Sequence, residues 1–293
     1  MNEQLKQIIN KAKIAGSKYR LNTAFNFSFS SNGDKRGTGI GSSLEFLDHR
    51  EYFPGDDIRN IDWKTVAKYE KPYVKLFKEE VLPVVELVLD GSTSMSLNDS
   101  KKYEALWGLS ELLKESAKNS GCSVIRKVIR SNCVNLSSSE IEKCVDYELL
   151  WDCKTDAGKN FVAFPPKFKP RSIRILLSDL FWDIEPASFL RVFTKGASMT
   201  AVIQVVAEAD ENPVFLGNIK LVDSETGEFT EMMVDESIIA QYEKNYSLHR
   251  DNWQNACRTS GTIFTHLVAE TFCKDFTPHN LFETMILLPE TIK

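Results

Sequence analysis

The sequence lacks the cysteine and histidine patterns of a zinc site. Its six cysteines are widely spaced and include no C-x-x-C pair; they stand at positions 122, 133, 144, 153, 257 and 273. The four histidines form no H-E-x-x-H motif and have no zinc-finger spacing. We therefore expect reduced cytosolic thiols and no zinc site.

Long apolar runs and an excess of basic residues are also missing. No segment approaches the roughly 20 apolar residues that cross a bilayer, and residues 1–16, MNEQLKQIINKAKIAG, lack the apolar centre of a signal peptide. The 41 Asp and Glu residues outnumber the 36 Lys and Arg residues, which gives a net charge of −5. This balance argues against nucleic acid as the main partner. We expect a soluble cytoplasmic protein without a transmembrane segment.

The sequence also lacks the motifs of a nucleotide-binding loop. Residues 22–48 alternate apolar and polar side chains around the turn signal SNGDKRG, and this pattern predicts a β-hairpin. The glycines of GTGIG in this stretch are not followed by the Lys-Ser/Thr of a P-loop, and they do not separate a strand from a helix. The hairpin is therefore the better interpretation.

From residue 81 onward the chain alternates apolar strands with amphipathic helices. Near-continuous apolar runs at 84–90, 173–180 and 199–206 are typical of parallel strands that are covered on both faces. Helical stretches at 103–118 and 185–197 separate these runs. The pattern predicts an α/β fold with a doubly wound, mostly parallel sheet that is flanked by helices.

The length of 293 residues exceeds the usual size of a single domain, so we expect one main domain with an added segment. We assign residues 81–293 to the α/β domain. Residues 1–80 would form an N-terminal helix and a small β-rich extension. The helix is predicted from apolar residues at the spacing of one helical stripe, namely Leu5, Ile8, Ile9 and Ala12.

The segment DGSTSM, residues 90–95, stands at the carboxyl end of the first predicted strand. In an open parallel sheet, ligands bind in the crevice beyond the carboxyl ends of the strands. Asp90, Ser92 and Ser94 present hard oxygen atoms there, and such oxygens suit Mg²⁺ or Mn²⁺. The alternative is structural, because the same residue types are common turn formers and N-caps, here for a helix over 99–118.

Two further residues extend this candidate site. Asp179 ends the predicted strand 173–180, and its carboxylate would face the same crevice if that strand neighbours the first one. Thr155 lies in the polar segment KTDAGKN, residues 154–160, which we expect to be a loop between these strands. The sequence therefore places five oxygen-bearing side chains near one edge of the predicted sheet.

This set of residues resembles the metal-ion-dependent adhesion site of the von Willebrand factor type A domain. That site combines a D-x-S-x-S motif, a distant loop threonine and a distant strand-end aspartate. The resemblance implies a metal site made of Asp90, Ser92, Ser94, Thr155 and Asp179. Thr194 and Thr200 are the alternatives for the loop threonine.

Residues 44–80 resemble the signature of the bacterial domain-of-unknown-function family 58, which carries the block R-x-Y-x-P-G-D-D-x-R-x-I-D-W ahead of a type A domain. The matching residues here are Arg50, Tyr52, Pro54, Gly55, Asp56, Asp57, Arg59, Ile61, Asp62 and Trp63. The resemblance implies a cytosolic or membrane-associated bacterial protein that works beside a MoxR-type AAA+ ATPase. It also implies metal-assisted partner binding, and it implies no particular reaction.

The same block can also be interpreted in terms of local structure. Pro54 and Gly55 favour a turn, and Asp56 or Asp57 is placed to cap a short helix. Arg59 and Asp62 are three positions apart, where they would pair on one helical face. Trp63 would then anchor the helix to the core. The alternative is a partner-binding surface made of Asp56, Asp57 and Arg59.

Together these features predict a protein–protein interaction module that is not an enzyme. Mg²⁺ or Mn²⁺ at the adhesion-type site would bind an acidic residue of the partner. Phosphotransferases with an aspartyl nucleophile need a second carboxylate two positions on, where this chain has Ser92. No G-x-S-x-G elbow of a serine hydrolase occurs. A metal-dependent hydrolase or phosphatase, and a scaffold with an empty metal site, are the alternatives.

Overall fold

The structure is a computed structural model that describes residues 3–23, 46–69, 71–77, 83–97, 100–137, 156–224 and 226–290. It divides into a large unit, Met1–Asn26 with Pro83–Lys293, and a small unit, Phe27–Leu82. Most of the predicted hairpin over 22–48, including GTGIG, lies outside the described residues. Within the described ranges, no helix has the length and apolar content needed to span a membrane.

The large unit is built from alternating helices and strands. Its helices are α1 (Glu3–Gly16), α3 (Lys102–Asn119), α5 (Ala157–Ala163), α6 (Pro186–Phe193), α7 (Glu208–Glu211), α8 (Glu236–Thr259), α9 (Ala269–Asp275) and α10 (His279–Glu283), with a 3-10 helix η3 (Thr93–Ser96). Its strands are β1 (Tyr19–Leu21), β4 (Val84–Asp90), β5 (Ser123–Ile129), β6 (Cys133–Asn135), β7 (Ile173–Ser178), β8 (Met199–Val206), β9 (Gly217–Val222), β10 (Phe229–Val234), β11 (Ile263–Val268) and β12 (Leu287–Pro289).

Six of these strands form one sheet in the order β11-β8-β7-β4-β5-β6. All neighbouring pairs are parallel except β5 with β6. The predicted α/β class with a mostly parallel sheet is therefore confirmed, and the apolar runs at 84–90, 173–180 and 199–206 become β4, β7 and β8. The chain leaves β4 on one side to form β5 and then returns to form β7 on the other side. The strand order thus reverses between β4 and β7.

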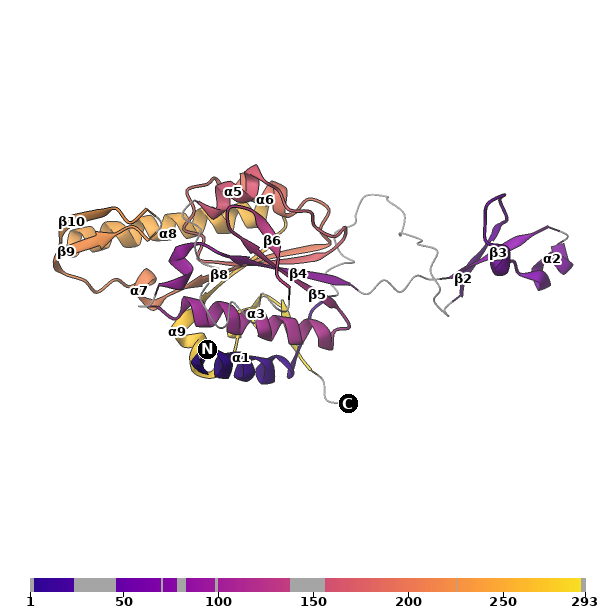
Figure 1. Ribbon diagram of the computed structural model, residues 1–293, viewed down its shortest axis with the longest axis horizontal. Coiled ribbons are helices and arrows are strands. Elements are labelled where there is room, and N and C mark those ends of the chain that lie inside the picture. The colour runs from indigo at the N-terminus through magenta and orange to yellow at the C-terminus, as the bar shows by residue number, and fades with distance from the viewer. Residues whose placement is uncertain are drawn as a thin grey trace. The chain divides into compact units, whose positions relative to one another are not determined.

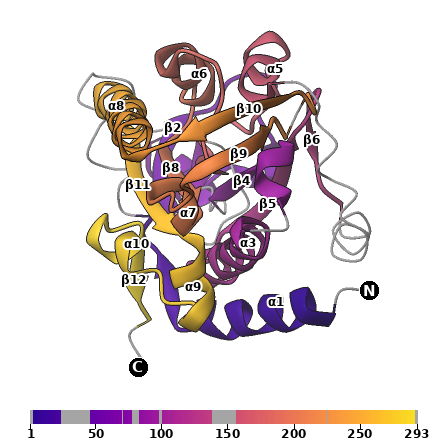
Figure 2. The same ribbon diagram turned by 90° about the vertical axis from the view of Figure 1, so that its left-hand side faces the viewer.

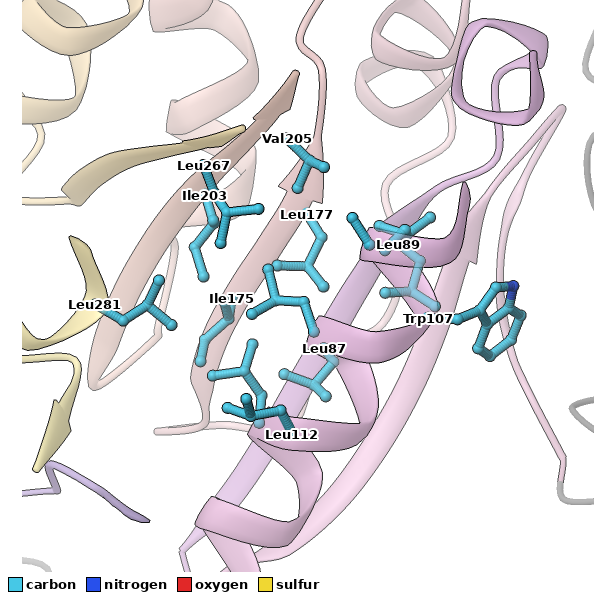
Figure 3. Packing of buried hydrophobic residues seen from close by; sticks show 14 of the residues in the cluster. Leu87, Leu89, Trp107, Leu112, Ile175, Leu177, Ile203, Val205, Leu267 and Leu281 are labelled. Carbon is cyan, nitrogen blue, oxygen red and sulfur yellow. The ribbon is translucent and has the colours of Figure 1, made fainter. Parts of the chain in front are cut away.

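Helices cover both faces of this sheet (Figures 1 and 2). Helices α3, α1 and α9 lie on one face, and α5, α6 and α8 lie on the other. Side chains of β4 alternate between the two faces, as a strand requires. Leu87 and Leu89 pack with the α3 side (Figure 3), whereas Val88 packs in the core with Phe189 and Trp253. Both faces are buried, which explains the near-continuous apolar runs.

The predicted apolar stripe of α1 packs in the large unit, with Leu5 and Ala12 fully buried. Gly16 allows α1 to approach α3, because a Cβ atom at this position would lie 2.6 Å from the carbonyl oxygen of Leu112. The hydroxyl of Ser116 donates to the Gly16 carbonyl at 3.2 Å. From the sequence we assigned this helix to the segment 1–80, whereas in the structure it packs on the α/β body.

Strand β5 was not among the predicted strands, because charged residues interrupt its apolar pattern. Arg126 and Lys127 stand in its middle, and both side chains are buried. Arg126 forms an ion pair with Glu111 on α3, and Lys127 Nζ lies 3.5 Å from Glu86 on β4. Buried charges are tolerated when they are paired, and here the partners come from distant segments.

The small unit contains an antiparallel pair of strands and two short helical turns. Its elements are β2 (Phe46–Glu51), η2 (Ile58–Asn60), α2 (Trp63–Tyr69) and β3 (Tyr73–Phe77). Glu51 pairs with Tyr73 in the β2–β3 register, and an isolated bridge joins Ile61 to Val74. The P-G-D-D block therefore lies in the connection between β2 and α2.

Candidate functional site

The DGSTSM segment leaves the carboxyl end of β4 in a tight turn. The Gly91 amide donates to the carbonyl oxygen of Ile129 at 2.9 Å. A Cβ atom at Gly91 would lie 2.4 Å from that same oxygen, so only glycine fits without a shift of the backbone. Ser92 is the N-cap residue of η3, but its side chain makes no capping hydrogen bond. The N-cap residue of α3 is Lys101, so the proposed capping role of these residues toward that helix is wrong.

The three oxygen-bearing side chains of the motif lie together. The hydroxyl oxygens of Ser92 and Ser94 are 3.0 Å apart. Asp90 Oδ1 accepts a hydrogen bond of 2.9 Å from the Ser92 amide. Asp90 and Ser92 are buried and Ser94 is half-buried, so the group reaches the surface through Ser94.

The end of β7 lies directly beside this group. The Ser178 hydroxyl donates to Asp90 Oδ2 at 2.5 Å, and it also accepts from the Leu180 amide at 2.8 Å. Asp179 is fully buried, and its Oδ1 accepts from the Phe181 amide at 3.2 Å. The strand ends at Ser178, so Asp179 is the first residue of the following loop. Both aspartates thus lie where the strand order reverses, the place at which open α/β sheets bind ligands.

The two buried carboxylates influence each other. Burial, followed by the negative charge of Asp179, raises the pKa of Asp90 from 3.8 to about 7. The hydrogen bonds from Ser178 and Ser92 oppose this shift without cancelling it. Asp90 is therefore a carboxyl group whose charged form lacks compensation, and a bound cation would supply it.

Lys102 is a residue of this site that the sequence analysis missed. It is the first residue of α3, and its side chain is 2% exposed. Its Nζ atom lies 3.0 Å from Asp179 Oδ2 and 3.2 Å from Asp210 Oδ2. Although burial lowers the pKa of Lys102, these two carboxylates raise it above its ordinary value. The available signal was its spacing, because Lys102 stands four positions before Leu106 on the buried stripe of α3.

Thr155 lies outside the described residues. The next residue, Asp156, caps α5 by accepting from the Lys159 amide at 2.8 Å, and its other oxygen accepts from the Asp183 amide at 2.7 Å. Residues 157–160 are therefore helical, and the prediction of a loop over them is wrong.

The two alternative threonines lie elsewhere. Thr194 Oγ1 donates to the Leu190 carbonyl at the end of α6. Thr200 pairs with Arg174 in the β7–β8 register, near the amino end of β7, and its hydroxyl contacts that of Thr262 at 2.8 Å. Thr194 lies at this same end, because Arg174 donates to the carbonyl oxygen of its neighbour Phe193. The carboxyl-end site of Asp179 is at the other end of β7, so neither threonine belongs to it.

The donor set fits a hard divalent cation. In the described part of the chain, no three His, Cys, Asp or Glu side chains gather as potential metal ligands. Hydroxyl and carboxylate oxygens of Asp90, Ser92 and Ser94 do gather, and these suit Mg²⁺ or Mn²⁺. Gln204 Oε1 is buried without a hydrogen-bond partner among the described residues, while its Nε2 donates to the Asp179 carbonyl. Such an atom is commonly satisfied by ordered water.

The P-G-D-D block forms the predicted capped turn but makes different ion pairs. Asp57 is the N-cap of η2 and accepts from the Arg59 amide at 3.0 Å. The Arg59 guanidinium also pairs with Asp57, at 2.8 Å. Asp62 instead contacts His49 at 2.8 Å and Lys75 at 3.8 Å. The predicted pair of Arg59 with Asp62 is therefore wrong, because the chain turns between them.

Two other statements about this block have different outcomes. Trp63 is 67% exposed, so the predicted anchoring of its ring in a core is wrong. Asp56 is held inside its own turn by Arg50 at 2.8 Å and by the Phe53 amide at 2.9 Å. Asp57 and Arg59 are exposed, and a partner surface that includes them stays a prediction.

The family described as "Protein of unknown function DUF58" matches residues 48–133. The matched range contains the whole P-G-D-D block from Arg50 to Trp63, strand β4 and the DGSTSM segment, so the resemblance to family 58 is confirmed over this range. No curated protein matches the chain.

Two solved structures from Bacteroides are similar to parts of the chain. The conserved hypothetical protein BatB from Bacteroides thetaiotaomicron is 12% identical, with a TM-score of 0.33; the match covers 66% of this chain and 97% of BatB. An aerotolerance-related membrane protein from Bacteroides fragilis NCTC 9343, solved with multiple mutations to serines, is 16% identical, with a TM-score of 0.38. That match covers 69% of this chain and 99% of the other.

Proposed function

We propose that this chain is a metal-dependent protein-binding module with a von Willebrand factor A-like domain. In this proposal Ser92 and Ser94 bind Mg²⁺ or Mn²⁺ directly, Thr155 binds it directly or through water, and Asp90 and Asp179 act largely through water. The bound ion would supply an electrophilic position for an acidic residue of a protein partner. The chain's own residues hold the site in shape and leave that position to the partner.

One observation carries the proposal. The D-x-S-x-S group and Asp179 come from segments 85 or more positions apart in the sequence, and the Ser178–Asp90 hydrogen bond of 2.5 Å joins their two strands at the point where the strand order reverses. A role as turn formers explains the local bonds of Ser92 and Ser94. It does not explain why two carboxylates are buried beside them.

Binding is favoured over catalysis by what surrounds the hydroxyls. Ser92 and Ser94 contact each other, and three of the described histidines have other neighbours: His249 Nε2 lies 2.9 Å from the Leu180 carbonyl, His266 Nε2 lies 4.0 Å from Glu211, and His49 contacts Asp62. A serine nucleophile needs a base within hydrogen-bond reach. A screen for metal-dependent phosphatase or esterase activity tests this point, and activity that is lost in Asp90→Asn would favour the hydrolase alternative.

The partner that we propose is a MoxR-type AAA+ ATPase. This choice rests on the resemblance to family 58, which the match over residues 48–133 supports. The chemical group that we expect to bind the site can be stated without identifying the partner. It is an exposed aspartate or glutamate that completes the coordination of the ion.

The first test is titration of the purified chain with Mn²⁺ and Mg²⁺, monitored by calorimetry. We expect saturable binding to the wild type and at least ~tenfold weaker binding to Asp90→Ala, because the variant lacks the buried carboxylate of the site. Asp251→Ala is the matched control, since it removes an exposed carboxylate from α8. Equal metal affinity in all three proteins would remove the proposed site and favour the alternative of a scaffold whose adhesion-type site is empty.

The second test concerns the partner. A purified MoxR-type ATPase from the same organism is titrated onto the immobilised chain in Mg²⁺ and again in EDTA. We expect EDTA and Asp90→Ala each to weaken the interaction, whereas Asp251→Ala has no effect. Binding that is indifferent to EDTA would assign the contact to another surface, such as the one around Asp57 and Arg59.

A further inference from the structure

A buried lysine shares the candidate site with its carboxylates. The ammonium group of Lys102 lies between Asp179, from the loop after β7, and Asp210, from α7 after β8, at 3.0 and 3.2 Å. The ring of Phe181 covers it at 5.5 Å. Lysine side chains are almost never fully buried unless they are paired, and the two carboxylates provide this pairing for Lys102.

The neighbouring lysine shows the difference. Lys101 is 46% exposed and pairs with Glu104 on the same helix at 2.8 Å. Such a surface pair contributes little to stability or function. Lys102 is the next residue and the first residue of α3, and its side chain is buried in the carboxyl-end site. The two lysines therefore form a natural comparison of a surface charge with a charge inside the site.

Lys102 changes the electrostatics that a metal ion would meet. Asp179 Oδ2 accepts from the Lys102 ammonium, and Asp179 Oδ1 accepts from the Phe181 amide. Both oxygens of this carboxylate thus have partners within the chain. A dication that approaches Asp179 meets an existing positive charge, and like charges at such distances in a buried site repel strongly.

We propose that Lys102 is a built-in counter-cation of Asp179 that makes metal binding conditional on the partner's carboxylate. This inference rests on the proposed function. The ammonium lowers the affinity of the free chain for a dication. It also leaves the metal-loaded site more positive by one charge, which favours an acidic ligand. Metal and acidic partner then bind cooperatively, and by linkage each raises the affinity of the chain for the other by the same factor.

Asp210 provides a second ion-pair partner for the Lys102 ammonium. Asp210 keeps the ammonium paired when Asp179 turns toward a metal ion, so the lysine is not left as an unpaired buried charge. Asp210 is itself held in place, since its Oδ2 accepts from the Ala207 amide at 2.9 Å and the Tyr242 hydroxyl donates to its carbonyl oxygen. The ammonium therefore has a fixed alternative partner.

The test measures Mn²⁺ affinity by electron paramagnetic resonance, with and without acetate as a stand-in for the partner's carboxylate. Lys102→Gln removes the charge and keeps a hydrogen-bond donor. We expect it to bind Mn²⁺ roughly tenfold or more tightly than the wild type without acetate. Acetate is expected to strengthen Mn²⁺ binding more in the wild type than in this variant. Lys102→Arg, which keeps the charge, and Lys101→Gln, which removes a surface charge, should both resemble the wild type.

The possible failures are distinguishable. If Asp90→Ala loses metal binding but folded Lys102→Gln binds Mn²⁺ no more tightly than the wild type, this inference is overturned and the proposed function stands. If Asp90→Ala binds Mn²⁺ like the wild type, the proposed function fails as well. Should Lys102→Gln not fold, Asp210→Asn takes its place. It leaves the ammonium to Asp179 alone, and we expect weaker Mn²⁺ binding; unchanged affinity would overturn the inference.

Discussion

The hydroxyl group of Ser178 donates a 2.5 Å hydrogen bond to Asp90 Oδ2, and this bond joins β7 to β4 at their carboxyl ends. Leu89 and Leu177, the residues just before them, are partners in the parallel register. The bond holds the ends of the two strands side by side. The acceptor of this bond, Asp90, is fully buried.

A pH dependence of stability follows from Asp90. Burial and then the charge of Asp179 raise its pKa from 3.8 to about 7 in the folded chain. Because the folded pKa exceeds the unfolded one, the protonated form stabilises the fold below about pH 4, and this contribution is lost as the pH rises through about 7. In EDTA at pH 8 we expect Asp90→Asn to be ~1–3 kcal/mol more stable than the wild type.

Urea unfolding of both proteins at pH 5 and pH 8 checks this expectation. The difference in the free energy of unfolding between the wild type and Asp90→Asn, compared at the two pH values, reports on Asp90, because the other carboxylates titrate in both proteins. Mn²⁺ affinity of the wild type is expected to rise over the same range, because the metal competes with the proton on Asp90. Parallel stability curves for the wild type and Asp90→Asn would contradict the assignment.

Ser94→Ala tests the hydroxyl ligand without opening the core. Ser94 is half-buried and, within the described residues, its hydroxyl contacts that of Ser92, so we expect a loss of stability below ~1 kcal/mol. Mn²⁺ affinity should fall ~tenfold or more, as measured by calorimetry. Ser96→Ala is the control, because its hydroxyl donates to the Thr93 carbonyl in the same turn. Equal metal affinity in the two variants would exclude Ser94 as a ligand.

Gly91→Ala tests the close approach of the DGSTSM turn to β5. The added Cβ would lie 2.4 Å from the Ile129 carbonyl oxygen and 3.0 Å from Val128 Cγ2. Backbone must move to relieve this contact, so we expect a loss of ~2–4 kcal/mol in the free energy of unfolding. Metal affinity should fall with it, because Asp90 and Ser92 flank the displaced residue. A variant with wild-type stability would indicate that the turn is looser than described.

Gly16→Val tests the docking of α1 on α3. A Cβ at Gly16 would lie 2.6 Å from the Leu112 carbonyl oxygen, and a branched side chain has no room there. We expect α1 to detach, with faster hydrogen exchange over residues 3–16 by mass spectrometry. Ile14→Ala is the control, since Ile14 is 64% exposed on the same helix and its truncation should leave exchange unchanged. Slow exchange over α1 in Gly16→Val would contradict this packing.

Much of the sheet was predictable because its central strands are buried on both faces. Strands β4, β7 and β8 appear in the sequence as apolar runs, and the leucine stripe of α3 appears at helical spacing. Strand β5 was not predictable in the same way. Its Arg126 and Lys127 are typical of exposed positions, and their burial is acceptable because Glu111 and Glu86, from other elements, pair with them.

The P-G-D-D block shows the same limit at short range. The cap formed by Asp57 depends on its immediate neighbours, and the sequence indicated it correctly. The partner of Asp62 depends on the path of the chain, which brings His49 and Lys75 beside it in place of Arg59. Spacing along a helix was a poor guide there, because η2 ends before Asp62.

The sequence by itself determined the central strands β4, β7 and β8, the helices α3 and α6 between them, and the oxygen-rich ends of β4 and β7, because burial on both faces and strand-end polarity leave a local pattern. The tertiary structure alone decided that these two strands are neighbours, that Ser178 bonds to Asp90, and that Lys102 lies among the carboxylates. Pairing between distant segments depends on strand order and on helix packing, and the local pattern of apolar and polar residues does not specify which segments become neighbours.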